Sequence, residues 1–598
     1  MSFAHLKARR AARDGRWRAR GRDGGKGRGE DDTGEAGTGV QEDEEQGTGI
    51  VEEEQHEPHL AGTPADDPPP ELRGSQLTLF TTAGHGRGLQ RARDAPGAQA
   101  GDELLAVEPH ASVLSTAQAD MRCHYCFVKR AALQRCSGCK FARYCSAACQ
   151  RSAWTKARHR DECPALQRWF AAAKEAGHAP ADPGAAVRVL AQLVWHRRKH
   201  GVQSAWWKGV ASMQSHRATM SEAQQAECAE LAFRVAHFLT LDALPSYGFD
   251  GASGLLDMVC AYRTNAFTLA DAQLDPIGVS VSVPIALFNH ACDPNAVVVF
   301  PRAGDRTMRV VAIKPIAPGA EVLTSYVDLA EPLAQRQATL SSRYLFTCTC
   351  RLCTTSAHPP KHWTDPRTAI WCEHNCSGWA ALPNWRQLPV DDTSLASGAC
   401  NRCGKTSMLH APREIHARWT ATEALMERVQ KAMQGEASHD SLGDVLSTVR
   451  WLSTLAPPSN TLLWTLMHAA HVLAIETGAF AEATHLAFVL CAGMQACGGR
   501  EADSALYPPG HPLRAVMFAT LGKLLLHETP PCPPLLARMP AVPADRAVQL
   551  ALARQALVQA LDEARCGFGR SVDGGDVAAD VRDSLTALEQ EQAVLRSM

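Results

Sequence analysis

Cysteines at short, repeated spacings are the residues of this sequence with the most definite chemistry. The chain holds 21 cysteines, and most of them lie in short clusters with histidines nearby. Between residues 123 and 163 the thiol and imidazole side chains form closely spaced pairs: Cys123 and Cys126, Cys136 and Cys139, Cys145 and Cys149, and His159 and Cys163. Both members of each pair can reach one ion, so these ligands predict two closed tetrahedral zinc sites. Because no position is left for water, both ions are expected to be structural.

A second group of thiols is one ligand short of a zinc site. Cys348, Cys350 and Cys353 supply three ligands, and Cys292 is the expected fourth. Cys292 lies in the stretch from Asn289 to Asn295, between two apolar runs. This stretch also carries two amides and an imidazole, which is more than a turn between strands requires, so it predicts a ligand site.

A third group of thiols lies within residues 356–415. Its members are Cys372, Cys376, Cys400 and Cys403. Their spacing is that of a zinc ribbon and predicts a fourth zinc ion. Two alternatives stay open, namely His374 as a substitute ligand and four cysteines without a metal.

Length and composition indicate a soluble chain of several domains. At 598 residues the sequence has room for roughly three or four of them. No apolar run reaches the roughly eighteen residues that cross a bilayer. The net charge of -2 gives no global argument for binding nucleic acid or a membrane. The start lacks a signal-peptide pattern, so the clustered cysteines indicate zinc thiolates in a reducing compartment, the cytoplasm or the nucleus.

The first 74 residues are strongly biased in composition. Residues 1–28 are rich in Lys and Arg, and residues 30–67 are acidic. Such a segment has too few apolar side chains to offset the entropy of ordering it, so we expect a disordered tail. The basic block is a solvated tail, a contact for RNA or import machinery, or a transit peptide.

Strand and helix patterns divide the rest of the chain and indicate the α+β class. Short strands are expected at 76–82, 103–107, 111–114, 262–269, 277–288, 309–313 and 322–326, with a glycine-rich turn at 84–89. Apolar residues at helical spacing predict helices across 164–244 and again from 419 onward. The second helical region is expected to stack paired helices in tetratricopeptide fashion.

Several motifs follow one another in a definite order along residues 76–355. They are Gly-Arg-Gly-Leu at 86–89, the cysteine cluster with Tyr144, Gln150 and Trp154, Asn-His-x-Cys-x-Pro-Asn at 289–295, Gly-x-Glu-x4-Tyr at 319–326 and Cys-x-Cys-x2-Cys at 348–353. This order resembles the SET and MYND domain (SMYD) family of protein lysine methyltransferases. The resemblance implies a SET-domain β-fold interrupted by a MYND zinc finger and a helical insert. A post-SET zinc site and an α-helical, tetratricopeptide-like C-terminal domain complete the implied fold.

Composition, cysteine spacing and the resemblance together predict the domain boundaries. They are a disordered tail (1–74), an N-terminal SET part (75–122), the MYND finger (123–163), a helical insert (164–245), the core SET part (246–330), the post-SET segment (331–355), the zinc-ribbon insert (356–415) and the helical C-terminal domain (416–598).

The resemblance also implies the metal ligands and the cofactor site. Zinc ligands of the family's finger interleave, which implies one ion on Cys123, Cys126, Cys145 and Cys149, one on Cys136, Cys139, His159 and Cys163, and a third on Cys292, Cys348, Cys350 and Cys353. The implied methyl donor is S-adenosylmethionine, with Gly86, Arg87 and Gly88 at its methionine end, Asn265, Asn289 and His290 at its amino acid and ribose, and Phe346 at its adenine. Tyr326 and Tyr344 would flank the point of methyl transfer, with Tyr326 as the catalytic residue.

The chemistry of methyl transfer suits these residue types. Displacement at a sulfonium needs a neutral amine and a straight approach, so positioning and electrostatics suffice and no strong base is required. A lysine has a pKa of about 10.4, and an apolar channel beside a cation favours its neutral form. The alternative for Tyr326 is a buried strand tyrosine whose hydroxyl is satisfied by the fold.

A second class of function is a protein-binding scaffold with a vestigial SET domain. MYND fingers commonly engage proline-rich peptides, and a helical C-terminal domain can present a groove. Basic residues of the finger, such as Lys129, Arg130 and Arg143, add an auxiliary nucleic-acid contact as a further hypothesis. The expected partners are therefore a lysine-bearing protein substrate and proline-rich peptides, with no membrane, for a chain that acts as a monomer.

Overall fold

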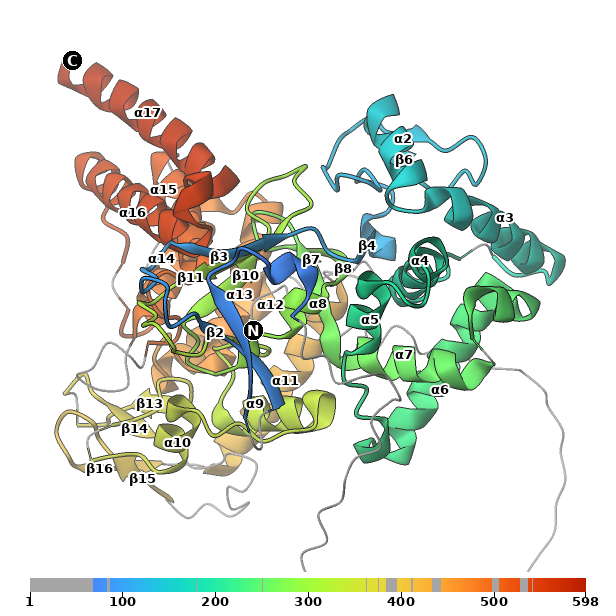
Figure 1. Ribbon diagram of the computed structural model, residues 1–598. Helices are drawn as coiled ribbons and strands as arrows, with labels where there is room; N and C mark the ends of the chain where they lie inside the picture. Colours follow the sequence, from blue (N-terminus) through green and yellow to red (C-terminus); the bar gives the residue numbers. More distant parts are fainter. Residues whose placement is uncertain are drawn as a thin grey trace, which may run out of the picture.

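The computed structural model separates a β-rich centre from helical regions on two sides (Figure 1). It describes residues 68–82, 86–179, 181–249, 251–361, 363–374, 376–382, 395–409, 412–432, 442–496, 505–527, 536–539 and 541–597. The predicted disordered tail lies outside the described residues as far as residue 67, and the predicted turn at 84–89 does so at residues 84 and 85. The described chain begins with a 3-10 helix, η1 (Pro70–Leu72).

The centre is built from small sheets whose strands come from both sides of the finger. A hairpin joins β1 (Leu77–Thr82) to β2 (Gly86–Arg91). One three-stranded sheet has the strand order β10 (Ala296–Val299), β11 (Met308–Ala312), β3 (Glu103–Val107). The other has the strand order β4 (Ala111–Leu114), β8 (Pro276–Val281), β7 (Ala266–Ala270). A parallel pair joins β9 (Asn289–His290) to β12 (Leu323–Thr324). These pairings confirm the predicted strands at 76–82, 103–107, 111–114 and 309–313 to within a residue or two.

The sheet of β10, β11 and β3 is buried on both faces. Because side chains alternate along a strand, Val310 faces the central core while its neighbour Val311 faces the C-terminal helices. Ala296 and Val297 divide in the same way on β10. This sheet therefore joins the β-rich centre to the helical domain.

The finger and the helical insert form one further hydrophobic core. Its elements are η2 (Thr116–Gln118), β5 (Gln134–Arg135), β6 (Arg143–Tyr144), α2 (Ala147–Thr155), α3 (His159–Glu175), α4 (Ala185–His200), α5 (Ala205–Ala211), η3 (Arg217–Thr219), α6 (Glu222–Leu239), η4 (Leu241–Ala243), η5 (Pro245–Tyr247) and α7 (Ala252–Asn265). Helix α6 begins at Glu222, because Ser221 and Gln224 form a reciprocal capping box. In Figure 1 the finger elements α2 and β6 stand away from the central sheets.

Three strand predictions are wrong in part. Residues 262–265 were expected in a strand but form the last turn of α7. The buried residues Leu255 and Val259 lie one turn apart on this helix. Packing of α7 against α6 therefore outweighs the local β propensity of residues 262–265. Helical structure thus continues past the predicted boundary at 245. Within 277–288 the strand ends at Val281, and a short helix α8 (Val283–Ala286) follows, because Pro284 cannot donate to a sheet and suits a first helical turn. Within 322–326 only Leu323 and Thr324 pair as a strand.

The segment after the central sheets leads into hairpins and then helices. It contains α9 (Leu333–Thr339), a π-helical turn η6 (Leu340–Tyr344), α10 (Arg351–Ala357), and two antiparallel hairpins, β13 (Ala369–Trp371) with β14 (Trp379–Ala381) and β15 (Leu395–Ala399) with β16 (Thr406–Leu409). The helices are α11 (Pro412–Ala432), α12 (Leu442–Leu455), α13 (Thr461–Glu476), α14 (Phe480–Gln495), α15 (Pro512–Leu526), α16 (Arg546–Gly567) and α17 (Gly575–Ser597), with η9 (Arg570–Val572) before the last.

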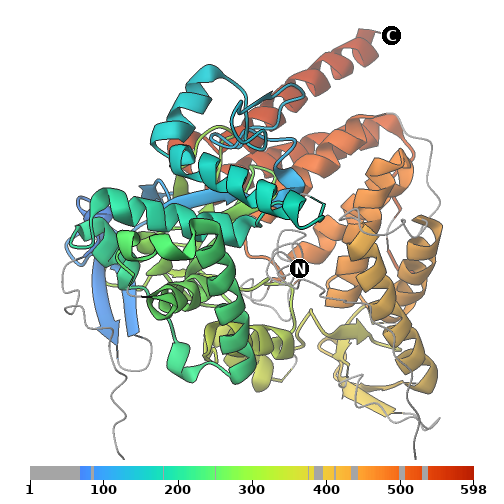
Figure 2. The same ribbon diagram turned by 90° about the vertical axis from the view of Figure 1, so that its right-hand side faces the viewer.

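Consecutive C-terminal helices pack on one another from α12 to α17 (Figure 2). This stacking agrees with the predicted helical region and its paired arrangement. Their apolar faces share one large core with Val299 and Val311 of the central sheet. Among the described residues, none of the helices combines the length and the apolar character needed to cross a bilayer.

Candidate cofactor and metal sites

Four aromatic rings lie together, two predicted to flank the methyl-transfer point (Tyr326 and Tyr344) and two predicted to contact the cofactor (His290 and Phe346). The ring centroids of Tyr326 and Tyr344 are 4.9 Å apart, and the His290 centroid is 5.2 Å from that of Tyr326 and 5.9 Å from that of Phe346. Tyr326 follows β12, His290 lies on β9, and Tyr344 and Phe346 lie at the end of η6 and just beyond it. Leu345 between them has a φ of 63°, a left-handed turn that lets both neighbours face the same cluster.

The Tyr326 hydroxyl has a fixed role in this cluster. It donates to the backbone carbonyl of Phe288 at 2.7 Å, and the Tyr326 amide donates to His290 Nδ1 at 3.0 Å. That second bond replaces a strand hydrogen bond, which explains why the predicted strand at 322–326 stops at Thr324. Burial, with Tyr344 and Glu321 nearby, raises the pKa of Tyr326 above its usual range, so the phenol stays protonated.

Gly88 on β2, Asn289 on β9 and Glu321 just before β12 form a tight junction beside the rings. The Asn289 amide donates to Glu321 Oε1 at 2.8 Å. A Cβ at Gly88 would lie 2.6 Å from the Asn289 nitrogen and 2.9 Å from Glu321 Oε1. Only glycine fits there, so the predicted glycine signal has a steric cause. The role of Glu321 as the partner of Asn289 was not foreseen from the sequence.

Gly86, Arg87 and Asn265 converge on the loop after α5. Arg87 donates to the carbonyl of Ser212, and the Asn265 amide donates to the carbonyls of Gln214 at 3.2 Å and Ala261 at 2.8 Å. Gly86 has a φ of +67° and faces the Gln214 side chain. The structure therefore brings the predicted cofactor residues into two adjoining groups, one around Gly88 and one around residues 212–214.

The predicted third zinc quartet is assembled. The Sγ atoms of Cys292, Cys348, Cys350 and Cys353 all lie within 4.8 Å of one another. Two residues of α9 support Cys348 and Cys353, a role that sequence reasoning missed. The Gln337 amide donates to the Cys348 carbonyl at 2.7 Å and its oxygen accepts from the Cys348 amide at 3.0 Å, while the buried Arg336 reaches Cys353 Sγ. Four mutually close thiols, with an arginine against one of them, suit a zinc thiolate centre.

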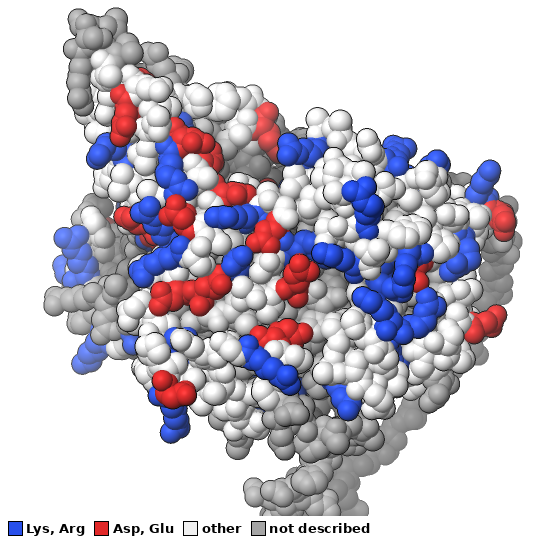
Figure 3. Space-filling view, turned by 45° about the horizontal axis from the view of Figure 1, so that its top comes forward, with Lys and Arg blue, Asp and Glu red and all other residues white. Residues whose placement is uncertain are grey.

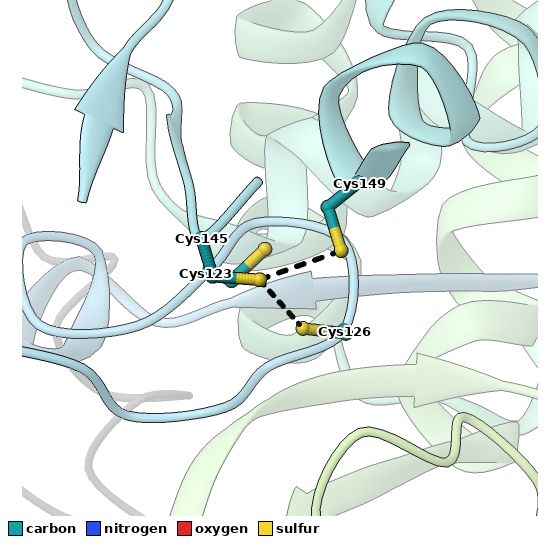
Figure 4. Close-up of side chains that lie close together, drawn as sticks. All are labelled: Cys123, Cys126, Cys145 and Cys149. Carbon is teal, nitrogen blue, oxygen red and sulfur yellow. Dashed lines mark hydrogen bonds between the residues drawn. The ribbon is translucent and has the colours of Figure 1, made fainter. Parts of the chain in front are cut away.

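The finger contains two further quartets that match the interleaved assignment. Cys123, Cys126, Cys145 and Cys149 form one, and Cys136, Cys139, His159 and Cys163 form the other. Figure 4 shows the first of them, with Cys126 Sγ 3.6 Å from Cys145 Sγ and the latter 3.5 Å from Cys149 Sγ. Spacings of this size fit ligands around one zinc ion and are far too long for disulfide bonds.

Glu162 and Arg188 support the second quartet and were missed by sequence reasoning. His159 Nδ1 lies 2.9 Å from Glu162 Oε2, which leaves Nε2 directed at the thiols. Arg188 on α4 donates to Glu162 Oε1 at 2.9 Å. Burial opposes ionisation of Glu162, but Arg188 and His159 outweigh it and hold the pKa of this carboxyl below its usual range. A carboxylate behind a metal-binding histidine fixes its orientation, and the i, i+3 spacing to His159 is the signal that could have found it.

The finger and about half of the chain match known proteins. A sequence model of the MYND finger family matches residues 123–163. Human N-lysine methyltransferase SMYD2 is 29% identical over 285 residues, which cover 47% of this chain and 60% of that protein. N-lysine methyltransferase SMYD2-B of Danio rerio is 32% identical over 289 residues, covering 47% and 61%. Human histone-lysine N-methyltransferase SMYD1 is 28% identical over 294 residues, covering 47% and 56%.

The extent of these matches defines what they support. The chain spans about six tenths of the length of the curated relatives it matches. A solved structure, the SET domain of LSMT bound to MeLysine and AdoHcy, covers 68% of this chain and 86% of that one at 12% identity, with a TM-score of 0.25 that is too low to indicate a shared fold. The zinc module matches the MYND finger, and the relatives to which about half of the chain is similar are SET and MYND domain (SMYD) methyltransferases.

Proposed function

We propose that this chain is an S-adenosylmethionine-dependent protein-lysine N-methyltransferase. The observation that carries the proposal is the ring cluster of Tyr326, Tyr344, Phe346 and His290 beside the Asn289–Glu321 pair. The names of the similar proteins, N-lysine and histone-lysine methyltransferases, support the same chemistry.

The residues around Gly88 fit the cofactor that this activity requires. S-adenosylmethionine, when bound, supplies a methyl group on a positively charged sulfur. Asn265, Asn289 and His290 would hold its polar parts, and Phe346 would lie against its adenine. Because Gly88 has no Cβ, β2 can lie close to the side chain of Asn289. The Asn289 side-chain nitrogen donates to Glu321, which leaves the Asn289 side-chain oxygen available to a ligand.

Tyr326 would act by position and polarity, not as a base. Because burial keeps its phenol protonated and the hydroxyl donates its hydrogen bond to the Phe288 carbonyl, the phenolic oxygen would present its lone pairs to the reacting methyl group. Burial away from water, next to the positive charge that the cofactor sulfur would carry, disfavours an ammonium ion, so a lysine entering between Tyr326 and Tyr344 would lose its proton to solvent. The two tyrosines would then hold the neutral lysine nitrogen in line with the methyl group that the cofactor would supply.

The Tyr326→Phe variant tests catalysis directly. We expect transfer of labelled methyl to protein substrates to fall on the order of 100-fold, as when one oriented donor or acceptor is removed from a reaction centre. The matched control is Tyr144→Phe in the finger, since its buried hydroxyl has no hydrogen-bond partner among the described residues. Equal activity of wild type and Tyr326→Phe across a proteome-wide substrate mixture would refute the proposal.

We further propose that the finger binds proline-rich segments of partner proteins. Trp154 on α2 is 45% exposed and packs edge-on against His159, so the finger offers an aromatic surface of the kind that proline-rich peptides use. Trp154→Ala should weaken binding of a proline-rich peptide in fluorescence titrations without loss of zinc. Unchanged affinity would contradict this part of the proposal.

Nucleic-acid contact is a weaker candidate for the same finger. Lys and Arg side chains gather on the side of the molecule that carries the finger and the helical insert (Figure 3). However, Arg143 pairs with Asp120, and the buried Arg158 pairs with Asp161. We therefore propose only an auxiliary, salt-sensitive contact, which binding titrations of a DNA duplex at low and high salt would reveal.

We also propose a monomer that works in the cytoplasm or the nucleus. All the cysteines that the structure describes are free thiols, which agrees with a reducing compartment. Light scattering after size exclusion would test the monomer, and imaging of a tagged chain would test the location.

A further inference from the structure

Cys372, Cys376, Cys400 and Cys403 bring two hairpins together at one point. Cys372 and Cys376 lie in the turn between β13 and β14, and the other two lie between β15 and β16. Cys376 Sγ is 3.5 Å from Cys400 Sγ, and Cys372 Sγ is 3.7 Å from Cys403 Sγ. A tetrahedral site with metal–sulfur bonds of about 2.3 Å has edges of about 3.8 Å, so these spacings fit four thiolates on one ion.

The turn at Cys400 repeats the backbone geometry of the two knuckles in the MYND finger. In each turn the residue four positions after the first cysteine donates its amide to that cysteine's carbonyl: Gly404 to Cys400 at 3.0 Å, Phe127 to Cys123 at 2.9 Å, and Lys140 to Cys136 at 3.0 Å. These residues all have left-handed backbones, with φ values of 72°, 63° and 58°. The finger thus supplies an internal standard for a zinc-binding turn.

Two contacts of the Cys400 sulfur suit a closed metal site at this turn. The Arg402 amide donates to Cys400 Sγ at 3.4 Å, and such bonds stabilise negative charge on sulfur. A Cβ at Gly378 would lie 2.6 Å from the same sulfur, so glycine is required for the hairpins to close. His374 Nδ1 lies 3.6 Å from Cys372 Sγ, but the four thiols already complete a tetrahedron.

The hairpins bury little apolar surface among their described residues. There, the apolar cluster consists of Ile370 and Ala380, with Leu382, Ile415 and Leu455 packed against it. Isolated two-stranded hairpins are only marginally stable in water, and a small module of this kind takes its folding free energy from a metal.

The first hairpin is also docked on the C-terminal helices (Figures 1 and 2). Trp371 Nε1 donates to the Ser453 carbonyl of α12 at 3.1 Å, and Asn460, the N-cap of α13, donates its amide to the Ala369 carbonyl at 3.0 Å. Two residues before Ala369 in the chain, the Arg367 carbonyl accepts a hydrogen bond from the Thr461 backbone amide at 3.0 Å. Whether β13 is well ordered therefore affects how α12 and α13 are positioned.

We propose that Cys372, Cys376, Cys400 and Cys403 hold a fourth, closed, structural zinc ion that keeps β13 seated on α12 and α13. The site lies outside the methyl-transfer residues, so it stands or falls independently of the proposed enzyme activity. Its effect is to fix the segment that leads from the central sheets into the helical domain.

Metal content of the full chain tests the site. Native mass spectrometry and elemental analysis should find four zinc ions per wild-type chain and three in Cys400→Ala. The matched control is Cys566→Ala, which removes a thiol outside the quartets and should keep four ions. Three ions in the wild type would overturn the proposal, and this count remains decisive if Cys400→Ala fails to fold.

Hydrogen–deuterium exchange tests the seating of β13. In Cys400→Ala we expect faster exchange at residues 369–371 and at the α12–α13 junction, with exchange of the finger unchanged. Loss of one ion with unchanged exchange at β13 would overturn the docking role. Neither measurement uses methyl transfer, so a failed activity assay leaves the result readable.

Discussion

His290 links the ring cluster to a zinc quartet through its two ring nitrogens. Nδ1 accepts the amide proton of Tyr326 at 3.0 Å, so the ring proton lies on Nε2. Nε2 is 3.2 Å from Cys292 Sγ, where that proton can be donated to a thiolate. The orientation of this imidazole therefore depends on the charge state of Cys292, and so on the metal.

This linkage predicts that Cys292→Ser loses metal and cofactor binding together. Removal of a zinc ligand frees Cys348, Cys350 and Cys353, and His290 loses the partner of its Nε2 proton. We expect one ion fewer by elemental analysis and an S-adenosylmethionine dissociation constant raised on the order of tenfold by calorimetry, as for lost supporting contacts of a site. Cys566→Ser is the control. A chain that loses the ion but binds the cofactor normally would disprove the coupling.

Glu162 provides a second prediction at the scale of single residues. Glu162→Ala leaves Arg188 buried without its carboxylate and removes the orienting partner of His159. We expect the free energy of unfolding to fall by about 3–5 kcal/mol. Affinity for the finger zinc should fall roughly 10- to 100-fold in competition with a chelator. Glu162→Gln, which keeps one acceptor for His159, should lie between Glu162→Ala and wild type, and equal behaviour of both variants would contradict a positioning role.

At the scale of elements, β2, β9 and the segment before β12 meet at Gly88. Gly88→Ala would place a methyl group 2.6 Å from the Asn289 nitrogen, so β2 must move away from β9. We expect cofactor binding to drop below detection by calorimetry and the melting temperature to fall. The control is Gly209→Ala in α5, where the nearest atom would be 3.6 Å away and alanine favours the helix. Normal cofactor affinity in Gly88→Ala would show that the junction does not shape the site.

The elements also show what sequence reasoning can reach. The metal quartets were predictable because thiol spacing reports local turn geometry, and strands such as β3 and β4 because their patterns are local. The end of α7 was not predictable, because packing on α6 decides between helix and strand for residues 262–265. The Glu162–Arg188 pair was not predictable either, since its members lie on different helices and only tertiary structure brings them together.

At the scale of the whole molecule, the hydrogen bonds of Arg367 link three regions of the chain. It is 2% exposed, and its guanidinium donates to the carbonyls of Leu329 and Leu506 and to Asp365. Leu329 ends the central part, Asp365 precedes the β13 hairpin, and Leu506 lies among the C-terminal helices. With the sheet that is buried on both faces, this arrangement makes the helical domain one body with the β-rich centre.

Buried and half-buried histidines in separate regions make the stability of the fold sensitive to acid. Burial lowers the pKa of His110 to about 4, and it lowers the pKa values of His196 and His511 to about 3. The unfolded chain binds these protons below its ordinary pKa of about 6.5, whereas the folded chain does not until pH is much lower. The stability contributed by the neutral rings is therefore complete above about pH 6.5 and declines as pH falls from there toward 4.

His511→Asn isolates one of these contributions. Neutral His511 Nδ1 caps α15 by accepting the Leu513 amide at 3.3 Å, and asparagine can cap the same helix without titrating. Between pH 6.5 and 4.5 the wild type should lose up to about 1.4 kcal/mol per pH unit more than His511→Asn in denaturant titrations. Acid release of zinc acts on both proteins alike, so the difference between their slopes reports His511. Parallel curves for His511→Asn and wild type would show that protonation of His511 does not destabilise the fold.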